Sequence, residues 1–192
     1  KINKIYILSR FKKKDINKKK YIKIEYIYKN ILNLKKIPHV DYIIYCLKNS
    51  NIKISKKYFN QFLKLLKNLK NKPKILFTSS GAIYGKNIDK KKDKESKIID
   101  LNSIKALNTY KKKYALEKIF IEQKIINLGL KNYSVSIARC YTFIGKNIIR
   151  YKFAIADLLN DALRNKVIKL KTRKNVYRSY MHSNDLAEWL IK

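Results

Sequence analysis

The sequence predicts a doubly wound parallel α/β fold, and two observations support this prediction. Short apolar runs typical of strands alternate along the chain with amphipathic stretches at helical spacing. This alternation is the pattern of a parallel sheet whose strands are joined by helical crossovers. The chain of 192 residues, 46% of them hydrophobic, is also long enough to bury a sizeable core.

The first half of the chain contains most of the expected strands. Lys4–Ser9 is a short apolar run, and Tyr21–Lys29 alternates with period two. Val40–Leu47 is apolar at nearly every position, so we expect a strand covered on both faces. Lys56–Leu69 has apolar residues at helical spacing, and Lys74–Ser80 reads as a further buried strand.

The second half contains one long charged stretch and several helices. Residues 86–108 are charged and aperiodic, which predicts a surface loop. Ser183 or Asn184 is the expected N-cap of the last helix. The expected elements are a helix over Tyr114–Gly129 with a glycine stop, a strand over Tyr133–Tyr141, and helices over Lys152–Asn165 and Ser183–Ile191.

The formal charge of +34 suggests a nucleic-acid-binding protein, because nucleic acids are polyanions that attract lysine. The lysines are spread along the whole chain, with no aromatic RNA-binding motif, zinc-finger spacing or basic zipper. Lys, Ile, Asn and Tyr are abundant while Gly and Pro are scarce, which is the bias of an A/T-rich coding sequence. We therefore expect no specific nucleic-acid partner, although the charge can speed the approach of an anionic substrate.

The expected location and the expected lack of a metal are based on three sequence patterns that were not found. No apolar run approaches the roughly 18 residues of a membrane span, and no secretory pattern opens the chain, so we expect a cytoplasmic protein without membrane contact. Cys46 and Cys140 lie far apart in apolar contexts, which indicates buried reduced thiols rather than a disulfide. No cluster has metal-ligand spacing, so we expect no metal.

Two groups of residues suggest a catalytic site. Thr78, Ser79 and Ser80 end a predicted buried strand, and ligands of parallel sheets bind at the carboxyl ends of the strands. Tyr114 and Lys118 are four residues apart, which places them on one helix face. A nearby ammonium stabilises a phenolate and lowers the tyrosine pKa, so this pair favours general acid–base chemistry.

With these residues the chain resembles the extended short-chain dehydrogenase/reductase family, which includes nucleotide-sugar epimerases and dehydratases. "TSSGAIYG" is similar to the strand-end motif of the family, and Tyr114 and Lys118 match its Y-x-x-x-K pair. "SIARCYTFIG" (Ser136–Gly145) and "VYRSYMHSNDLA" (Val176–Ala187) resemble two further motifs in the expected order. The resemblance implies a Rossmann-like sheet over residues 1–145 and the start of a small substrate-binding lobe over residues 146–192.

The resemblance also implies site residues. Tyr114 would exchange a proton with a sugar hydroxyl while a hydride passes to or from a nicotinamide, and Ser80 would hydrogen-bond the same sugar oxygen. Lys118 would hold the cofactor ribose and lower the pKa of Tyr114. The implied catalytic residues are Ser80, Tyr114 and Lys118; the further cofactor-binding residues are Ser9, Arg10, Cys46, Leu47, Ser79, Cys140 and Tyr141; the substrate-binding residues are Ser80, Tyr84, Thr142 and Arg178. Thr142 stands where the family often has asparagine.

One family feature has no match in this sequence. The family opens with a strand and a glycine-rich turn that cradles the pyrophosphate, but none of the four glycines belongs to such a turn. By motif order, Lys4–Ser9 resembles the second strand. In the strand order 3-2-1-4-5-6 the first strand is central, so a chain without it lacks a central pairing partner and should bind cofactor poorly.

The cofactor is expected to be NAD or NADP, with NADP slightly favoured. An acidic residue at the end of the second strand favours NAD, and an arginine accommodates a 2′-phosphate. Ser9 and Arg10 stand there, without a carboxylate before Asp15. The use of NAD by many epimerases of the family points the other way.

The resulting hypothesis is an NAD(P)-dependent epimerase or 4-ketoreductase that acts on a nucleotide-diphosphate sugar. A homodimer is a possible state of the full-length protein. Gly81 and Ala82 follow Ser80 where dehydratases of the family commonly carry an Asp-Glu pair, which weakens the dehydratase option. Two alternatives remain: a non-catalytic or truncated remnant of the family, and a basic nucleic-acid-binding protein.

Overall fold

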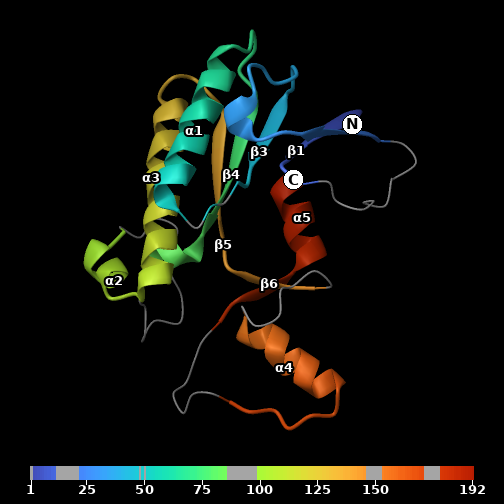
Figure 1. Cartoon of the computed structure of the whole chain (residues 1–192), viewed down its shortest axis with the longest axis vertical. Coiled ribbons are helices and arrows are strands. Elements are labelled where there is room, and N and C mark those ends of the chain that lie inside the picture. Colours follow the sequence, from blue (N-terminus) through green and yellow to red (C-terminus); the bar gives the residue numbers. More distant parts are fainter. Residues whose placement is uncertain are drawn as a thin grey trace. The chain divides into compact units, whose positions relative to one another are not determined.

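A computed structural model describes residues 2–11, 22–47, 49, 51–85, 99–145, 153–170 and 178–192 (Figure 1). Its strands are β1 (Lys4–Ser9), β2 (Lys23–Tyr28), β3 (Tyr42–Tyr45), β4 (Lys74–Ser80), β5 (Val135–Cys140), β6 (Thr142–Ile144) and β7 (Tyr180–His182). Its helices are α1 (Ile52–Lys67), α2 (Leu101–Lys105), α3 (Thr109–Gly129), α4 (Ala154–Leu163) and α5 (Ser183–Ile191), with 3-10 turns η1 (Ile31–Asn33) and η2 (Gly81–Tyr84). Parallel strands alternating with helices confirm the predicted α/β class.

The chain divides into two compact units. Unit 1 contains residues 1–77 and 119–136, and unit 2 contains residues 78–118 and 137–192. The boundaries fall inside β4, α3 and β5, so each of these elements contributes one part to each unit.

The strands that begin in unit 1 form two parallel sheets in place of the single sheet predicted. One sheet is β1–β2, with Lys4 opposite Lys23 and Ser9 opposite Tyr28. The other has the order β3–β4–β5, with Tyr42 opposite Lys74. The resemblance stated above implies that β1 corresponds to the second strand of the 3-2-1-4-5-6 arrangement and β3 to the fourth. The break between the two sheets therefore falls where that arrangement places its first strand.

The core of unit 1 lies between α1 and strands β3 and β4. Phe59 and Phe62 on α1 contact Tyr45 on β3, with ring centroids 5.2 and 4.7 Å apart. Phe77 on β4 lies 6.1 Å from Tyr45 and is fully buried, as is Phe59. These residues recur at helical spacing on α1 and on one face of the strands, which explains why α1 packs on this sheet.

The C-terminal half of α3 completes this layer. Figure 1 shows α3 running alongside α1, and the Lys56 ammonium of α1 lies 4.7 Å from the Phe120 ring centroid. Ile121 and Ile125 of α3 are buried. The helix ends at Gly129, as predicted.

Two predictions about the third strand are wrong. We expected Val40–Leu47 to be covered on both faces, but Tyr42 and Ile44 are 68% and 49% exposed. Their side chains point away from the face that carries Tyr45, because successive strand residues alternate between faces. Cys46, expected to be buried, directly follows the last residue of β3 and is exposed. Both cysteines are free thiols, as expected.

In unit 2 the predicted loop contains a helix. Residues 86–98 lie outside the described part of the chain, but residues 101–105 form α2. Asp100 caps it, because its carboxylate accepts hydrogen bonds from the backbone N–H groups of Asn102 and Ser103. Ile104 is buried, which supplies the helix with tertiary support. Such a short helix is not detectable from its sequence, because it buries one side chain and therefore shows no hydrophobic periodicity.

The C-terminal part of unit 2 contains β6 and β7, two strands that were not predicted from the sequence. They pair in parallel, with Thr142 opposite Tyr180. Strands of three residues are too short to produce a detectable alternation. Helix α5 begins at Ser183, but the predicted cap is wrong: His182 is the N-cap and its Nδ1 accepts from the Asn184 backbone N–H at 3.3 Å. Across the described ranges, no helix is both long and apolar enough to cross a bilayer.

Candidate active site

The carboxyl end of β4 carries the predicted serine pair into a tight turn. Ser79 is buried, at 4% exposure, and Ser80 is the N-cap of η2. The Ser80 hydroxyl oxygen accepts a hydrogen bond from the Ala82 backbone N–H at 3.2 Å. A hydroxyl that accepts in this way still has its own proton to donate to another oxygen. This is the capacity required of a group that binds a sugar oxygen.

Tyr114 and Lys118 lie one turn apart on α3, as the spacing predicts. The Lys118 Nζ donates to the Thr78 carbonyl oxygen at 2.9 Å, which ties α3 to the end of β4. The same ammonium lies 5.7 Å from the centroid of the Tyr114 ring. Lys118 is only 3% exposed, so its charge acts in a partly desolvated environment where electrostatic effects are stronger than in water.

Cys140, predicted to border the nicotinamide, lies within the electrostatic influence of Lys118. Burial raises the pKa of the Cys140 thiol above its ordinary value, and the nearby Lys118 charge opposes part of that rise. The balance keeps the side chain as a neutral thiol around neutral pH. Cys140 therefore presents a small, uncharged surface, which is suited to packing beside a planar ring.

The segment at the end of β5 contacts the serine turn at two points. A Cβ placed on Gly81 would lie 2.5 Å from the Tyr141 ring, so that ring packs directly against the glycine. Arg139 donates from Nη1 to the Tyr84 hydroxyl at 3.0 Å. Arg139 was not among the predicted residues. The signal that could have identified it is a lone cation inside an otherwise uncharged strand.

The remaining predicted substrate residues come from β6 and the segment before β7. Thr142 begins β6 and is half-buried, and its register partner is Tyr180. Arg178 is exposed and lies two residues before Tyr180 along the chain. The parallel pairing of β6 with β7 therefore brings the Thr142 and Arg178 segments into one neighbourhood of unit 2.

The residues predicted to bind the adenosine end of a cofactor lie in unit 1. Ser9, Arg10 and Leu47 line one hollow of about 190 Å³ at the ends of β1 and β2, which Lys29 also borders. Arg10 donates from Nη1 to the Tyr58 hydroxyl at 3.2 Å. Cys46, also predicted to bind cofactor, is not among the residues that line this hollow.

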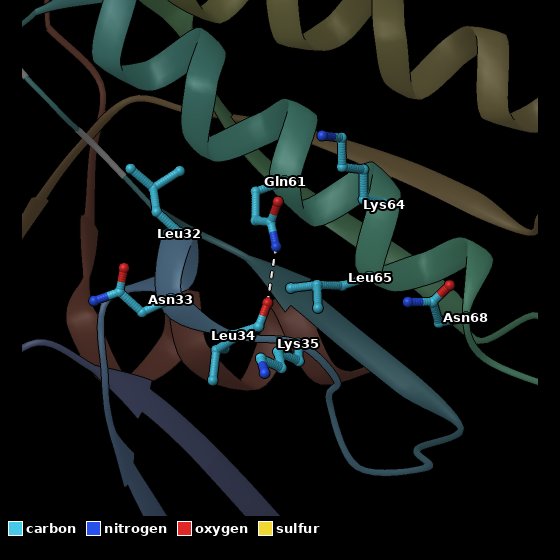
Figure 2. A pocket seen from close by; sticks show the side chains of 8 residues that line it. All are labelled: Leu32, Asn33, Leu34, Lys35, Gln61, Lys64, Leu65 and Asn68. Atoms are coloured by element: carbon cyan, nitrogen blue, oxygen red, sulfur yellow. Dashed lines mark hydrogen bonds between the residues drawn. The ribbon is translucent and has the colours of Figure 1, made fainter.

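A larger hollow of about 490 Å³ in the same unit is lined by none of the predicted residues (Figure 2). It lies between η1 and α1, where the Gln61 side-chain amide donates to the Leu34 carbonyl oxygen at 2.8 Å. The lining residues are Leu32, Asn33, Leu34, Lys35, Gln61, Lys64, Leu65 and Asn68. It is an open surface depression with no group that points to catalysis.

A nicotinamide cofactor can be tested against these features. The Lys118 ammonium donates to the Thr78 carbonyl oxygen at the end of β4, and an ammonium is a group that can donate to ribose hydroxyls. Arg10 and Lys29 give the hollow of unit 1 two cationic groups at the adenosine end. Each unit, taken by itself, therefore holds residues whose chemistry fits one part of such a cofactor. Within the described ranges, no group of three or more His, Cys, Asp or Glu residues could hold a metal ion.

Comparison with protein families gives a single family over nearly the whole chain. The sequence model described as "NAD dependent epimerase/dehydratase family" matches residues 12–192. A comparison with curated protein sequences gives no match.

Solved structures with the same fold include several nucleotide-sugar enzymes. UDP-N-acetylglucosamine 4-epimerase from Methanobrevibacter ruminantium M1, in complex with UDP-N-acetylmuramic acid, has a TM-score of 0.67 at 18% identity, over 97% of this chain and 63% of its own. UDP-glucuronic acid 4-epimerase from Bacillus cereus, with UDP-glucuronic acid and NAD, has a TM-score of 0.63 at 17% identity, over 88% and 55%. RMD from Pseudomonas aeruginosa, complexed with NADPH, has a TM-score of 0.59 at 17% identity, over 78% and 53%. This chain thus spans only about half to three fifths of these proteins.

Proposed function

Because this chain belongs to the NAD dependent epimerase/dehydratase family, we propose that it forms part of an NAD(P)-dependent nucleotide-sugar epimerase or 4-ketoreductase. The Gly81–Ala82 pair after Ser80 makes a dehydratase the weaker choice, because dehydratases of the resembled family commonly carry acidic residues there.

One observation carries this proposal: the buried Lys118 ammonium bonds the Thr78 carbonyl oxygen at the end of β4 and lies beside the Tyr114 ring. Such an ammonium stabilises a phenolate, which makes a tyrosine useful as an acid–base group near neutral pH. The same bond ties Tyr114's helix to the strand that ends in Ser80. A packing role alone does not require a buried lysine next to a tyrosine at a strand end.

The proposed reaction exchanges a proton and a hydride at one sugar carbon, and the nicotinamide, when bound, supplies the hydride chemistry. Tyr114 accepts the hydroxyl proton on oxidation and returns it on reduction. Ser80 donates its hydroxyl proton to the same sugar oxygen and orients it. Lys118 holds the cofactor ribose and favours the charged form of Tyr114. Cys140 and Tyr141 border the planar ring.

For the cofactor we favour NADP over NAD by a small margin. Arg10 and Lys29 both border the hollow at the end of β1, and two cations suit a 2′-phosphate. Solved structures of the same fold include three that hold NAD and one that holds NADPH. A comparison of dissociation constants for the two cofactors, in the parent chain and in Arg10→Ala, tests this choice. Loss of NADP binding with NAD binding retained supports it.

The substrate we propose is a nucleotide-diphosphate sugar. Arg178 can place its guanidinium fork on two phosphate oxygens. The charge of +34 accelerates the approach of such an anion at low ionic strength. A cytoplasmic location and a homodimer are further parts of the proposal.

The experiment is a turnover screen of the full native chain with UDP-, dTDP- and GDP-sugars, with either cofactor. Tyr114→Phe should lower kcat by about 100-fold or more, because it removes the acid–base group. Tyr110→Phe is the matched control, since Tyr110 lies one turn earlier on α3 and is 59% exposed. Absence of turnover in the parent chain supports the non-catalytic alternative instead. Equal turnover in Tyr114→Phe and the parent chain overturns the acid–base role of Tyr114.

A further inference from the structure

The turn η2, which follows Ser80, is held at both ends by side chains from the end of β5. At its first residue, the Tyr141 ring packs against Gly81 so closely that a Cβ there would overlap the ring. At its last residue, Tyr84 accepts the hydrogen bond from Arg139 at 3.0 Å. The Arg139 guanidinium also lies 5.3 Å from the Tyr84 ring centroid. Both contacts lie within unit 2.

The contact between Arg139 and Tyr84 is suited to fixing a position. Tyr84 is 4% exposed and its neighbour Ile83 is fully buried, so this end of the turn cannot move without opening the core. A hydrogen bond from a guanidinium is stronger than one between neutral groups. The cation above the ring adds a second attraction to the same side chain.

This restraint reaches Ser80 through a short path. The Ser80 hydroxyl oxygen is bonded to the Ala82 N–H, and the Ala82 carbonyl oxygen accepts from the Gly85 N–H at 3.1 Å. Ala82 lies between the two restrained residues of the turn. The rotamer of Ser80 is therefore linked to a backbone segment whose position depends on Tyr84.

We infer that Arg139 and Tyr84 act as a positioning pair that sets the direction of the Ser80 hydroxyl toward the sugar oxygen. This inference rests on the proposed function and adds to it. It assigns a role to Arg139, which was not among the site residues predicted from the sequence. It also gives Tyr84 a role through Ser80, in place of the direct substrate contact first expected.

The first test does not depend on activity. Tyr84→Phe removes the hydroxyl that Arg139 bonds and keeps the buried ring, so the fold should survive. Amide hydrogen exchange at Ala82, followed by NMR in the native chain, should become about tenfold faster, the equivalent of one lost hydrogen bond to a charged group. Tyr110→Phe, an exposed tyrosine of the same unit, is the control and should leave this exchange unchanged. Equal exchange at Ala82 in Tyr84→Phe and the parent chain overturns the inference.

The second test is kinetic. Tyr84→Phe should lower kcat by about tenfold with KM close to that of the parent chain, because the pair orients a group without binding substrate itself. In a Ser80→Ala background the same substitution should cause no further loss, since the hydroxyl to be oriented is already absent. The inference is overturned if the loss of kcat in the double variant equals the product of the losses in the two single variants.

Substitutions of Arg139 separate its charge from its geometry. Arg139→Lys keeps a cation and a donor and should recover part of the turnover that Arg139→Met loses. Equal turnover in these two variants counts against the pair. Failure of the proposed function has a different signature: Tyr114→Phe then retains turnover, whereas the exchange rate at Ala82 still reports on the pair.

Discussion

The packed layer of α1, β3 and β4 differs sharply from the described C-terminal residues, 153–170 and 178–192. In the packed layer Phe59 and Phe77 are fully buried, and the rings around Tyr45 form one aromatic cluster. Among the described residues from 153 onward, Ala156 is the one that is buried. The core thus fixes strand β4, which ends in Ser80, whereas little packing defines the segment of Arg178.

This difference separates the two halves of the proposed site. Ser80, Tyr114 and Lys118 lie on elements anchored by buried side chains or by the bond to Thr78. Arg178 is exposed, and α5, which follows it, has no buried residue. We therefore expect the acid–base groups to hold their geometry without substrate. The proposed contact of Arg178 with a diphosphate would depend on this loosely packed end.

The largest effect should come from a cavity in the packed layer. Phe59→Ala removes a fully buried ring and should lower the free energy of unfolding by about 3–5 kcal/mol. The matched substitution at the other end is Leu163→Ala, where the side chain is 85% exposed and the change should stay within about 0.5 kcal/mol. Urea unfolding measures both. Similar losses would show that the two regions are equally packed.

An intermediate effect is expected where the site meets the packed region. Lys118→Met keeps the length of the side chain but removes the bond to the Thr78 carbonyl, which should cost about 1–3 kcal/mol. Lys113→Met, at an exposed position of the same helix, is the control and should have no measurable effect. Thermal unfolding of the two variants and the parent chain measures the loss of stability in each. A neutral Lys118→Met would mean that the bond contributes to function alone.

A smaller effect should come from the cap of α2. Asp100→Ala removes the acceptor for the Asn102 and Ser103 backbone N–H groups and should cost about 1 kcal/mol. Asp100→Asn keeps an acceptor at the same position and should restore most of that stability. If both variants lose the same amount, the charge of Asp100 matters more than its hydrogen bonds.

The smallest effect concerns the two thiols. Cys140 is half-buried and burial raises its pKa, whereas Cys46 is exposed. Iodoacetamide, which reacts with the thiolate, should label Cys46 first and Cys140 only more slowly and at higher pH. In the unfolded chain Cys140 loses its proton at lower pH than in the folded chain. Its contribution to stability is therefore fully present below the unfolded pKa and is lost as pH rises through the folded pKa.

Mass spectrometry at several pH values measures the labelling of each cysteine separately. Denatured protein is the control, and both thiols should react there at similar rates. Faster labelling of Cys140 in the folded chain would contradict the burial of its sulfur.

Much of the fold could be predicted from local patterns. Strands β1 and β4 were predicted with the bounds that the structure has, and the glycine stop of α3 was correct. The errors arose where the pattern was short or depended on neighbours. The two strands of three residues gave no alternation, and α2 depends on one buried isoleucine. The exposure of Tyr42 depends on what covers each face of β3, which composition does not show.

The site divides in the same way. The spacing of Tyr114 and Lys118 fixed their common helix face, because the helical repeat is a local property. The sequence also placed Ser80 at a strand end. The bond from Lys118 to Thr78 joins residues 40 positions apart and could not be read from spacing.

What the sequence alone determined is the alternation of strands and helices, the order of the motifs and the residue types at the strand ends. These depend on neighbours along the chain. Only the tertiary structure decided that the parallel strands of unit 1 form two sheets, that Arg139 bonds Tyr84, and that Arg10 bonds Tyr58. Each of these contacts joins side chains or backbone groups far apart in sequence, and their geometry is set by packing of the whole chain.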